Sequence, residues 1–230
     1  MKTTRIYALV ALMMVFAVSC TKPDESNLVS GSYNGHDYVD LGLPSGILWA
    51  TCNLGAEKPE DYGNYYAWGE TQPKDYYYWS TYKYCSGVFA LIKYCCDSVY
   101  GYNGYTDNLT VLLPEDDAAK VNWGNGWRMP TKEELQELNN NTTSIWTTLS
   151  GVNGRLFTAS NGNSLFLPAA GSRWANEFDD AGFHGFFLSS SLDMRDPSCA
   201  WYFYFNSNYH AVDGRYRVGG YTVRPVCSAE

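Results

Sequence analysis

Short apolar runs recur along most of this chain, separated by stretches rich in glycine, proline and asparagine. Their length and their content of β-branched and aromatic residues are typical of β-strands bounded by turns. The predicted strands cover His36–Leu41, Ile47–Asn53, Leu156–Ala159, Ser164–Leu167, Gly185–Ser189, Ala200–Phe205 and Tyr221–Val226. The first two are joined by a predicted turn over residues 42–46, because glycine, proline and serine cluster there.

Two short helices are predicted from the residues at their N-terminal ends. Thr131 and Glu134 have the spacing of a capping box, which predicts a helix over about Lys132–Asn139. A second helix is predicted over Glu115–Val121, after Pro114, since its leading acidic residues suit the positive end of a helix dipole. The helices lie between the early and the late strands.

The long segment over residues 55–110 is rich in tyrosine, glycine and asparagine and has little periodicity. We expect it to form long ordered loops held by aromatic packing. No repeat with a period of 20–50 residues is present, which argues against solenoids and propellers. The pattern as a whole predicts an α+β fold with two short helices and much loop.

The first twenty residues have the pattern of an export signal. Lys2 and Arg5 are followed by an apolar run over Ile6–Val18, which is short for a membrane span, and then by small residues up to Cys20. This order resembles a bacterial lipoprotein signal, in which Cys20 becomes the lipidated N-terminus. The alternative is an ordinary secretory signal that is cut after Ser19.

The chain is therefore expected to have a lipoprotein signal peptide over residues 1–19, a lipid-anchored flexible tether over 20–34 and one folded domain over 35–230. Acyl chains on Cys20 would hold the protein on a membrane, and we expect no other membrane contact. Acidic residues soon after Cys20 resemble the surface-export signals of some Bacteroidota lipoproteins. We expect an outer-membrane lipoprotein exposed at the cell surface.

The charge of the chain limits its partners. Among 230 residues, 16 are Lys or Arg and 24 are Asp or Glu, which gives a formal net charge of −8. An acidic chain without a basic cluster is a poor match for nucleic acids, whose binding depends on neutralising phosphates. We therefore expect no nucleic-acid partner.

The sequence contains little that indicates catalysis or metal binding. The three histidines, His36, His184 and His210, are not in any metal-ligand spacing, and no G-x-S-x-G motif occurs. The acidic groups at 115–117 and 179–180 could supply oxygen ligands to calcium, but helix capping and solvation explain them better. We expect no catalytic residues, no metal and no cofactor.

Several blocks of the sequence stand out, in the order Tyr38–Gly46, Leu48–Asn53, Tyr62–Glu70, Gly126–Thr131, Phe166–Gly171, Ser189–Ser191 and Val223–Val226. In this order they resemble the Fibrobacter succinogenes major paralogous domain family. They span nearly all of residues 35–230. That family is similar in fold to C-type lectin-like domains, formylglycine-generating enzymes and the variable proteins of diversity-generating retroelements. The resemblance implies a C-type lectin-like fold, with a twisted antiparallel sheet, two short helices, and a face of long ordered loops near the C-terminal strands.

The cysteines bear on what the resemblance implies. Formylglycine-generating enzymes use two closely spaced cysteines near the C-terminus, whereas only Cys227 lies there in this chain, which argues against that oxidase activity. The implied fold brings the strands that contain Cys52 and Cys227 together, so a disulfide between them is expected. The alternatives are buried free thiols, or a pairing of Cys85 with Cys95 or Cys96.

A binding face is expected at the segment Trp201–Tyr216, which begins as an alternating strand and continues as a predicted polar loop. Alternation places Tyr202 and Tyr204 opposite Trp201, Phe203 and Phe205, which are expected in the core. Trp49, Trp68 and Trp127 are expected in the core as well. Tyrosine and asparagine give large contact area and adaptable hydrogen bonds. The candidate ligand-binding residues are Trp174, Tyr202, Tyr204, Asn206, Asn208, Tyr209, His210, Asp213, Arg215 and Tyr216.

These features favour a non-enzymatic module that binds an extracellular protein or glycan. One alternative is a retroelement variable protein with a diversified C-terminal site, since that family diversifies this stretch. Another is a structural subunit of a surface or fimbrial assembly. A formylglycine-generating oxidase has the least support.

Overall fold

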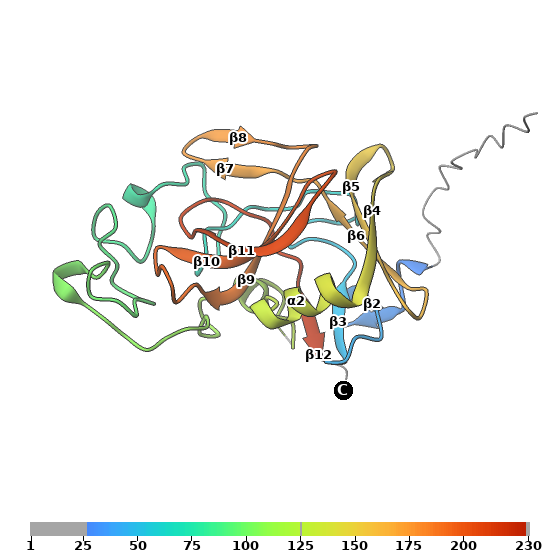
Figure 1. Ribbon diagram of the computed structural model, residues 1–230, viewed down its shortest axis with the longest axis horizontal. Helices are drawn as coiled ribbons and strands as arrows, with labels where there is room; N and C mark the ends of the chain where they lie inside the picture. Colours follow the sequence, from blue (N-terminus) through green and yellow to red (C-terminus); the bar gives the residue numbers. More distant parts are fainter. Residues whose placement is uncertain (1–26, 125, 229–230) are drawn as a thin grey trace, which may run out of the picture.

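Small antiparallel sheets make up most of the computed structural model, which describes residues 27–124 and 126–228 and has an α+β fold (Figure 1). One sheet has the order β1 (Gly31–Tyr33), β2 (His36–Asp40), β3 (Ile47–Ala50) and β12 (Val226–Ser228). It pairs the last strand with an early one, since Val226 lies opposite Trp49. The beginning and the end of the domain are thereby joined.

A second sheet contains β4 (Thr142–Leu149), β5 (Val152–Ala159) and β6 (Ser164–Pro168), in that order. The short strands β7 (Ser172–Trp174) and β8 (Glu177–Asp179) form a separate hairpin, at the top of Figure 1. The predicted strands at 156–159 and 164–167 are confirmed within β5 and β6. Strand β4 is absent from the predicted strands, although β-branched residues are frequent in it.

The third sheet has β10 (Cys199–Phe205) between β9 (Gly185–Leu192) and β11 (His210–Tyr216). Both faces of β10 are covered by apolar residues. Phe203 and Phe205 pack in one core cluster, while Tyr202 packs in another. The predicted alternation along this strand is confirmed for these residues, and β10 separates the two cores.

The helices begin where the sequence predicts or close to it. Helix α2 (Lys132–Asn141) has the predicted capping box between Thr131 and Glu134, and it packs against β9, β10 and β11. Helix α1 (Ala118–Trp123) begins later than predicted, because Asp117 is its N-cap and accepts a hydrogen bond from the Lys120 backbone N–H.

Two expectations about the ends of the domain are wrong. The expected tether extends to residue 34, yet Leu28 is buried with Leu149, Leu156 and Phe166, and β1 pairs with β2. The folded domain thus begins before residue 35. The predicted strand at 221–226 is also wrong, since only β12 is a strand there. The segment before β12 divides its backbone bonds among several partners, so no ladder forms.

The segment over residues 55–110 has the expected loop structure, with only the short 3-10 turns η2 (Trp79–Thr81) and η3 (Tyr102–Gly104). It forms the left side of the molecule in Figure 1. Its aromatic side chains supply much of the largest core cluster, including Trp68, Tyr82 and Tyr94. Aromatic burial rather than backbone pairing therefore orders these loops, as expected.

A buried carboxylate adds a polar centre to this core. The Asp116 side chain accepts hydrogen bonds from the hydroxyls of Tyr84 and Tyr94 and forms ion pairs with Lys93 at 2.5 Å and Lys83 at 3.2 Å. Burial by itself raises the pKa of Asp116, but these hydrogen bonds outweigh it and lower the pKa to about 2. The folded state thus stabilises the charged form.

We predict that Asp116→Asn destabilises the domain by about 2 kcal/mol at pH 7, since a pKa shift of one unit corresponds to about 1.4 kcal/mol. Because the folded pKa is depressed, this contribution is present above pH 4 and is lost as the pH falls toward 2. Urea unfolding at pH 7 and at low pH should show the difference between wild type and variant shrinking on acidification. Asp75→Asn, at an exposed position, is the control. A constant difference across this range would contradict the prediction.

Candidate functional site

The segment expected to be a polar binding loop is a β-hairpin. Strand β11 pairs with β10 along its whole length, and only residues 206–209 form the turn. Asn206 holds this turn, because its Oδ1 accepts the backbone N–H groups of Asn208 at 2.8 Å and Tyr209 at 2.9 Å. The expectation of a loop continuing to Tyr216 is wrong. The binding candidates are held by a regular ladder instead.

The register of this hairpin separates the candidates onto two faces. Asp213 lies opposite Tyr202, whereas His210 lies opposite Phe205 and so faces the other side. His210 Nδ1 is 2.7 Å from Asn139 Oδ1, and burial lowers the pKa of its imidazole. The inclusion of His210 in the binding face is therefore wrong, since it joins β11 to α2.

One part of the remaining candidates is a group of aromatic rings. The Trp174 and Tyr216 ring centroids are 6.1 Å apart, and Tyr78 contacts Trp174 edge-on at 5.5 Å. Phe89 lies 6.0 Å from Tyr216. Trp79 is buried beneath them, 6.0 Å from Tyr216. Residues far apart in sequence thus meet at the end of the hairpin.

A second group of side chains lies nearer the hairpin turn. Tyr204 contacts Tyr209 at 6.2 Å and Phe186 at 5.3 Å. The Arg215 guanidinium lies 4.4 Å from the Phe186 ring centroid, and its Nε donates to Tyr221 Oη at 3.1 Å. Arg215 and Tyr216 are consecutive in β11 and lie opposite Ala200 and Cys199, so their side chains leave the strand on opposite faces.

We call the accessible side chains of these two groups together the aromatic face. They are Tyr78, Phe89, Trp174, Tyr204, Tyr209, Arg215 and Tyr216. Tyr209 is 58% exposed, and Phe89 and Tyr216 are each a little over 40% exposed. Asn208 and Asp213 are also exposed beside it. Tyr202 is only 7% exposed, so it supports the face from below and its assignment as a contact residue is wrong.

No sequence signal distinguishes Tyr78 and Phe89 from the other aromatic residues around them. They belong to the aperiodic loop segment, where many aromatic residues occur and most are buried. Tyr78, for example, is half-buried between buried Tyr77 and buried Trp79. Only the packing of the loops against β11 distinguishes those that remain accessible.

The charge on this face comes from Arg215. Burial lowers the pKa of its guanidinium, but the neighbouring Tyr221 and Tyr202 hydroxyls raise it above its usual value. Burial raises the pKa of Tyr221 to about 12, so that hydroxyl is neutral at pH 7 and donates to the Tyr216 backbone carbonyl. The aromatic face thus contains one cation, which lies over the Phe186 ring.

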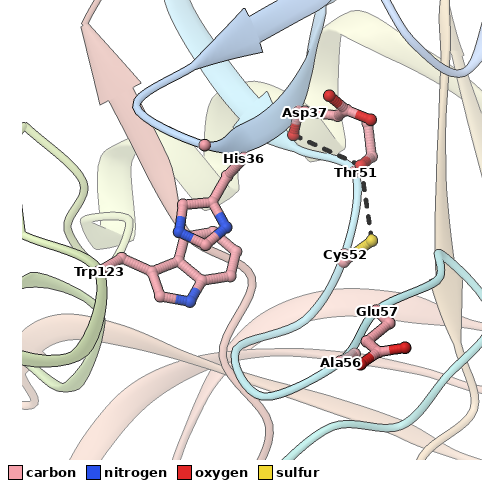
Figure 2. Close-up of a pocket in the computed structure, with 8 residues that line it drawn as sticks. His36, Asp37, Thr51, Cys52, Ala56, Glu57 and Trp123 are labelled. Atoms are coloured by element: carbon pink, nitrogen blue, oxygen red, sulfur yellow. Dashed lines mark hydrogen bonds between the residues drawn. The ribbon is translucent and has the colours of Figure 1, made fainter.

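A separate cavity of about 340 Å³ lies between the first sheet and α1 (Figure 2). The His36 ring stacks on Trp123 with centroids 3.6 Å apart, and burial lowers the pKa of His36. Cys52 also lines this cavity, but its Sγ contacts Thr51 Oγ1 at 3.5 Å, and Figure 2 shows it turned away from the imidazole. Within the described ranges, no three metal-binding side chains cluster. This cavity lacks a nucleophile–base pair.

Trp201 corrects a further expectation. It is half-buried rather than in the core, and it lines a cavity beside the N-terminus of α2. The Lys132 ammonium lies 3.7 Å and the Arg195 guanidinium 4.3 Å from its ring centroid. Two cations cover the indole where the apolar core ends. The predicted burial of Trp49, Trp68 and Trp127 is confirmed.

The expected Cys52–Cys227 disulfide is not formed, and all six cysteines of the described residues are free. Cys227 lies opposite Leu48, four residues before Cys52 in the chain, and is buried with Ala50 and Trp127. Cys52 lies beyond the end of β3 at Ala50, outside the residues that pair with β12. The two strands are adjacent, but the register separates the thiols.

The expected lipid anchor at Cys20 and the expected signal peptide lie outside the described residues, which begin at residue 27. Within residues 27–124 and 126–228, no helix has the length and apolar character needed to cross a membrane. Comparisons of the chain with protein families, with characterised proteins and with solved structures gave no match. The function is therefore inferred from the residues of the candidate site.

We predict that oxidation leaves Cys52 and Cys227 unlinked. Peptide mapping by mass spectrometry, after digestion without reductant and with free thiols blocked, should recover both as blocked thiols. Reduced and non-reduced samples should also unfold at the same urea concentration. A peptide that joins Cys52 to Cys227 would contradict the register of β3 and β12.

Proposed function

We propose that this protein is an envelope-anchored bacterial lipoprotein that binds an extracellular protein or glycan, without catalysis, through the aromatic face. The observation that carries the proposal is the exposure of large aromatic side chains that are also packed against one another, above all Tyr209, Phe89 and Tyr216. The seven side chains of the aromatic face come from four parts of the chain. The proposal includes lipidation at Cys20 and an outer-membrane location.

The chemistry of the aromatic face suits recognition. Tyrosine, tryptophan and arginine dominate the binding energy of many interfaces, because they combine large contact area with polar groups. Contiguous exposed apolar surface is rare on monomeric soluble proteins and marks interaction sites. The hairpin and the packed loops hold the rings in place, so little side-chain entropy is lost on binding.

The proposal includes a C-type lectin-like fold and membership of the Fibrobacter succinogenes major paralogous domain family. Antiparallel sheets, two short helices and the pairing of β12 with β3 are compatible with it. Two of the resembling blocks, Leu48–Asn53 and Val223–Val226, lie side by side. They meet through a side chain of the second block, since Arg224 donates to Asn53 Oδ1 at 2.8 Å.

Formylglycine generation is disfavoured by the state of the C-terminal thiols. Burial raises the pKa of Cys227 to about 11, and burial followed by the charge of Asp196 raises that of Cys199 to about 11. Thiols with such pKa values are protonated at pH 7, whereas thiolates are the reactive and metal-binding form. Oxidation of a sulfatase peptide, with and without copper, tests this alternative directly.

We predict that Tyr209→Ala and Phe89→Ala each weaken binding by about 1–2 kcal/mol, as truncation of interface aromatics does. These residues belong to the two different groups of the aromatic face and are exposed, so unfolding temperatures should stay nearly unchanged. A glycan array and immobilised mucin are the probes, and biolayer interferometry gives the affinity for the best of them.

Tyr102→Ala is the matched control, because Tyr102 is an exposed tyrosine in η3, outside the aromatic face. It should bind as the wild type does. Equal loss of binding in the control, or full binding by both test variants, would remove the aromatic face from the proposal.

We predict that Cys20 is the site of lipidation, because it follows the apolar run and the small residues of the signal. Cells grown with labelled palmitate should label the wild type and leave Cys20→Ser unlabelled. Cys85→Ser, which changes another cysteine outside the signal, should be labelled like the wild type. Equal labelling of Cys20→Ser would refute the anchor.

A further inference from the structure

Strand β4 is an open edge of its sheet. It pairs with β5 over all eight of its residues, from Thr142 opposite Ala159 to Leu149 opposite Val152. In the described part of the chain the sheet order is β4-β5-β6, with nothing paired beyond β4. An edge strand directs alternate backbone N–H and C=O groups outward, where they can pair with another strand.

The sequence of β4 contains none of the features that protect natural edges. It is TTSIWTTL, without charge, proline or glycine, and five of its eight residues are β-branched. Its pairing with β5 is unbroken, so no bulge turns the edge away. Proteins ordinarily protect edges with lysine, proline, bulges or short strands.

Other edge strands in the described residues are protected. Strands β1, β7, β8 and β12 have only three residues each. Strands β6 and β9 are buried along their whole length, and β11 contains the charged Asp213 and Arg215. Strand β4 is thus long, uncharged and partly exposed, whereas the other edge strands are short, buried or charged.

The two faces of β4 differ. Ser144 and Trp146 point inward, since Ser144 Oγ accepts from Arg155 Nη1 at 2.7 Å and Trp146 packs 6.4 Å from Phe205. Thr143 and Ile145 alternate with them and are exposed, Ile145 at 57%. A strand added at this edge would therefore continue both a covered face and an open face.

We propose that β4 pairs antiparallel with β4 of a second copy of this chain, about a twofold axis through Ile145. In this register Ile145 lies opposite Ile145 of the partner subunit, and Thr143 lies opposite Thr147 of the partner subunit. Thr142 lies opposite Thr148 of the partner subunit. Opposed residues point to the same face, as a continuous sheet requires, and most pairs are β-branched, which favours pairing.

A second copy fits this edge because the strand is complementary to itself. Because β4 has no charged residue, pairing two copies of it brings no like charges together. A twofold axis gives each copy the same contact surface, so the assembly closes at two copies. The result would be one sheet with the order β6-β5-β4 continued by the same strands of the second copy. The pairing uses the backbone edge of β4 and does not depend on the proposed ligand.

The dimer is expected to be weak in solution. A single strand pair buries less area than the about 1,600 Å² of a standard interface. The net charge of −8 on each copy also opposes association, so added salt should strengthen the dimer by screening it.

Sedimentation equilibrium of the full chain, in a density-matched detergent and over a series that reaches millimolar concentration, tests the proposal. Wild type should move from monomer to dimer along the series, at lower concentration in high salt. Ile145→Lys should remain monomeric with an unchanged melting temperature, because two ammonium groups would meet at the axis. Val99→Lys adds the same charge at an exposed position outside β4 and should dimerise like the wild type.

A mixture tests the register. Ile145→Lys and Ile145→Glu should each be monomeric alone, because like charges would meet at the axis. Mixed together they should form a dimer, because residue 145 of one copy lies opposite residue 145 of the other and the two new charges are of opposite sign. A wild type that is monomeric throughout, or an Ile145→Lys variant that dimerises like Val99→Lys, would overturn the proposal. A mixture that fails to dimerise would overturn the axis at Ile145.

Discussion

The buried guanidinium of Arg224 holds the two ends of this domain together. Arg224 is 1% exposed, and in the described structure no carboxylate forms an ion pair with it. Instead, Nη1 donates to the carbonyl groups of Ala50 and Thr51, and Nε donates to Asn53 Oδ1. Burial lowers the pKa of Arg224 to about 10, yet the group remains charged at pH 7. A buried charge is tolerated only when it is hydrogen-bonded. The hydrogen bonds of Arg224 therefore hold residues 50–53, at the end of β3, against the segment that leads into β12.

Arg217 holds the long loops of residues 55–110 in a similar way, through hydrogen bonds from a buried guanidinium. Its guanidinium is fully buried and donates to the backbone carbonyl groups of Lys93, Tyr94 and Pro197, beside the Trp68 ring. Arg217 directly follows β11, so it ties the aperiodic loops to the end of the hairpin. The aromatic face is built across that junction, and we infer that its geometry depends on this contact.

Much of the fold could be predicted because local signals specify it. The capping box at Thr131 and Glu134 places α2 from residues within one turn. Alternation along β10 separates Phe203 and Phe205 from Tyr202 because successive side chains point to opposite faces. Tyr204, Tyr209 and Trp174, which are among the ligand-binding residues expected from the sequence, belong to the aromatic face. Tyr78 and Phe89 could not be predicted, because loop packing alone exposes them.

The sequence by itself determined where the main helix begins, which way the residues of β10 alternate and which loops rely on aromatic packing. Only the tertiary structure decided that residues 210–216 form a strand, since polar residues there pair with β10 rather than with water. It also decided that His210 faces α2, that Trp201 lies beyond the core, and that Cys52 and Cys227 are apart. Capping and alternation act between neighbours in sequence, whereas strand register and the covering of a face depend on residues brought from elsewhere in the chain.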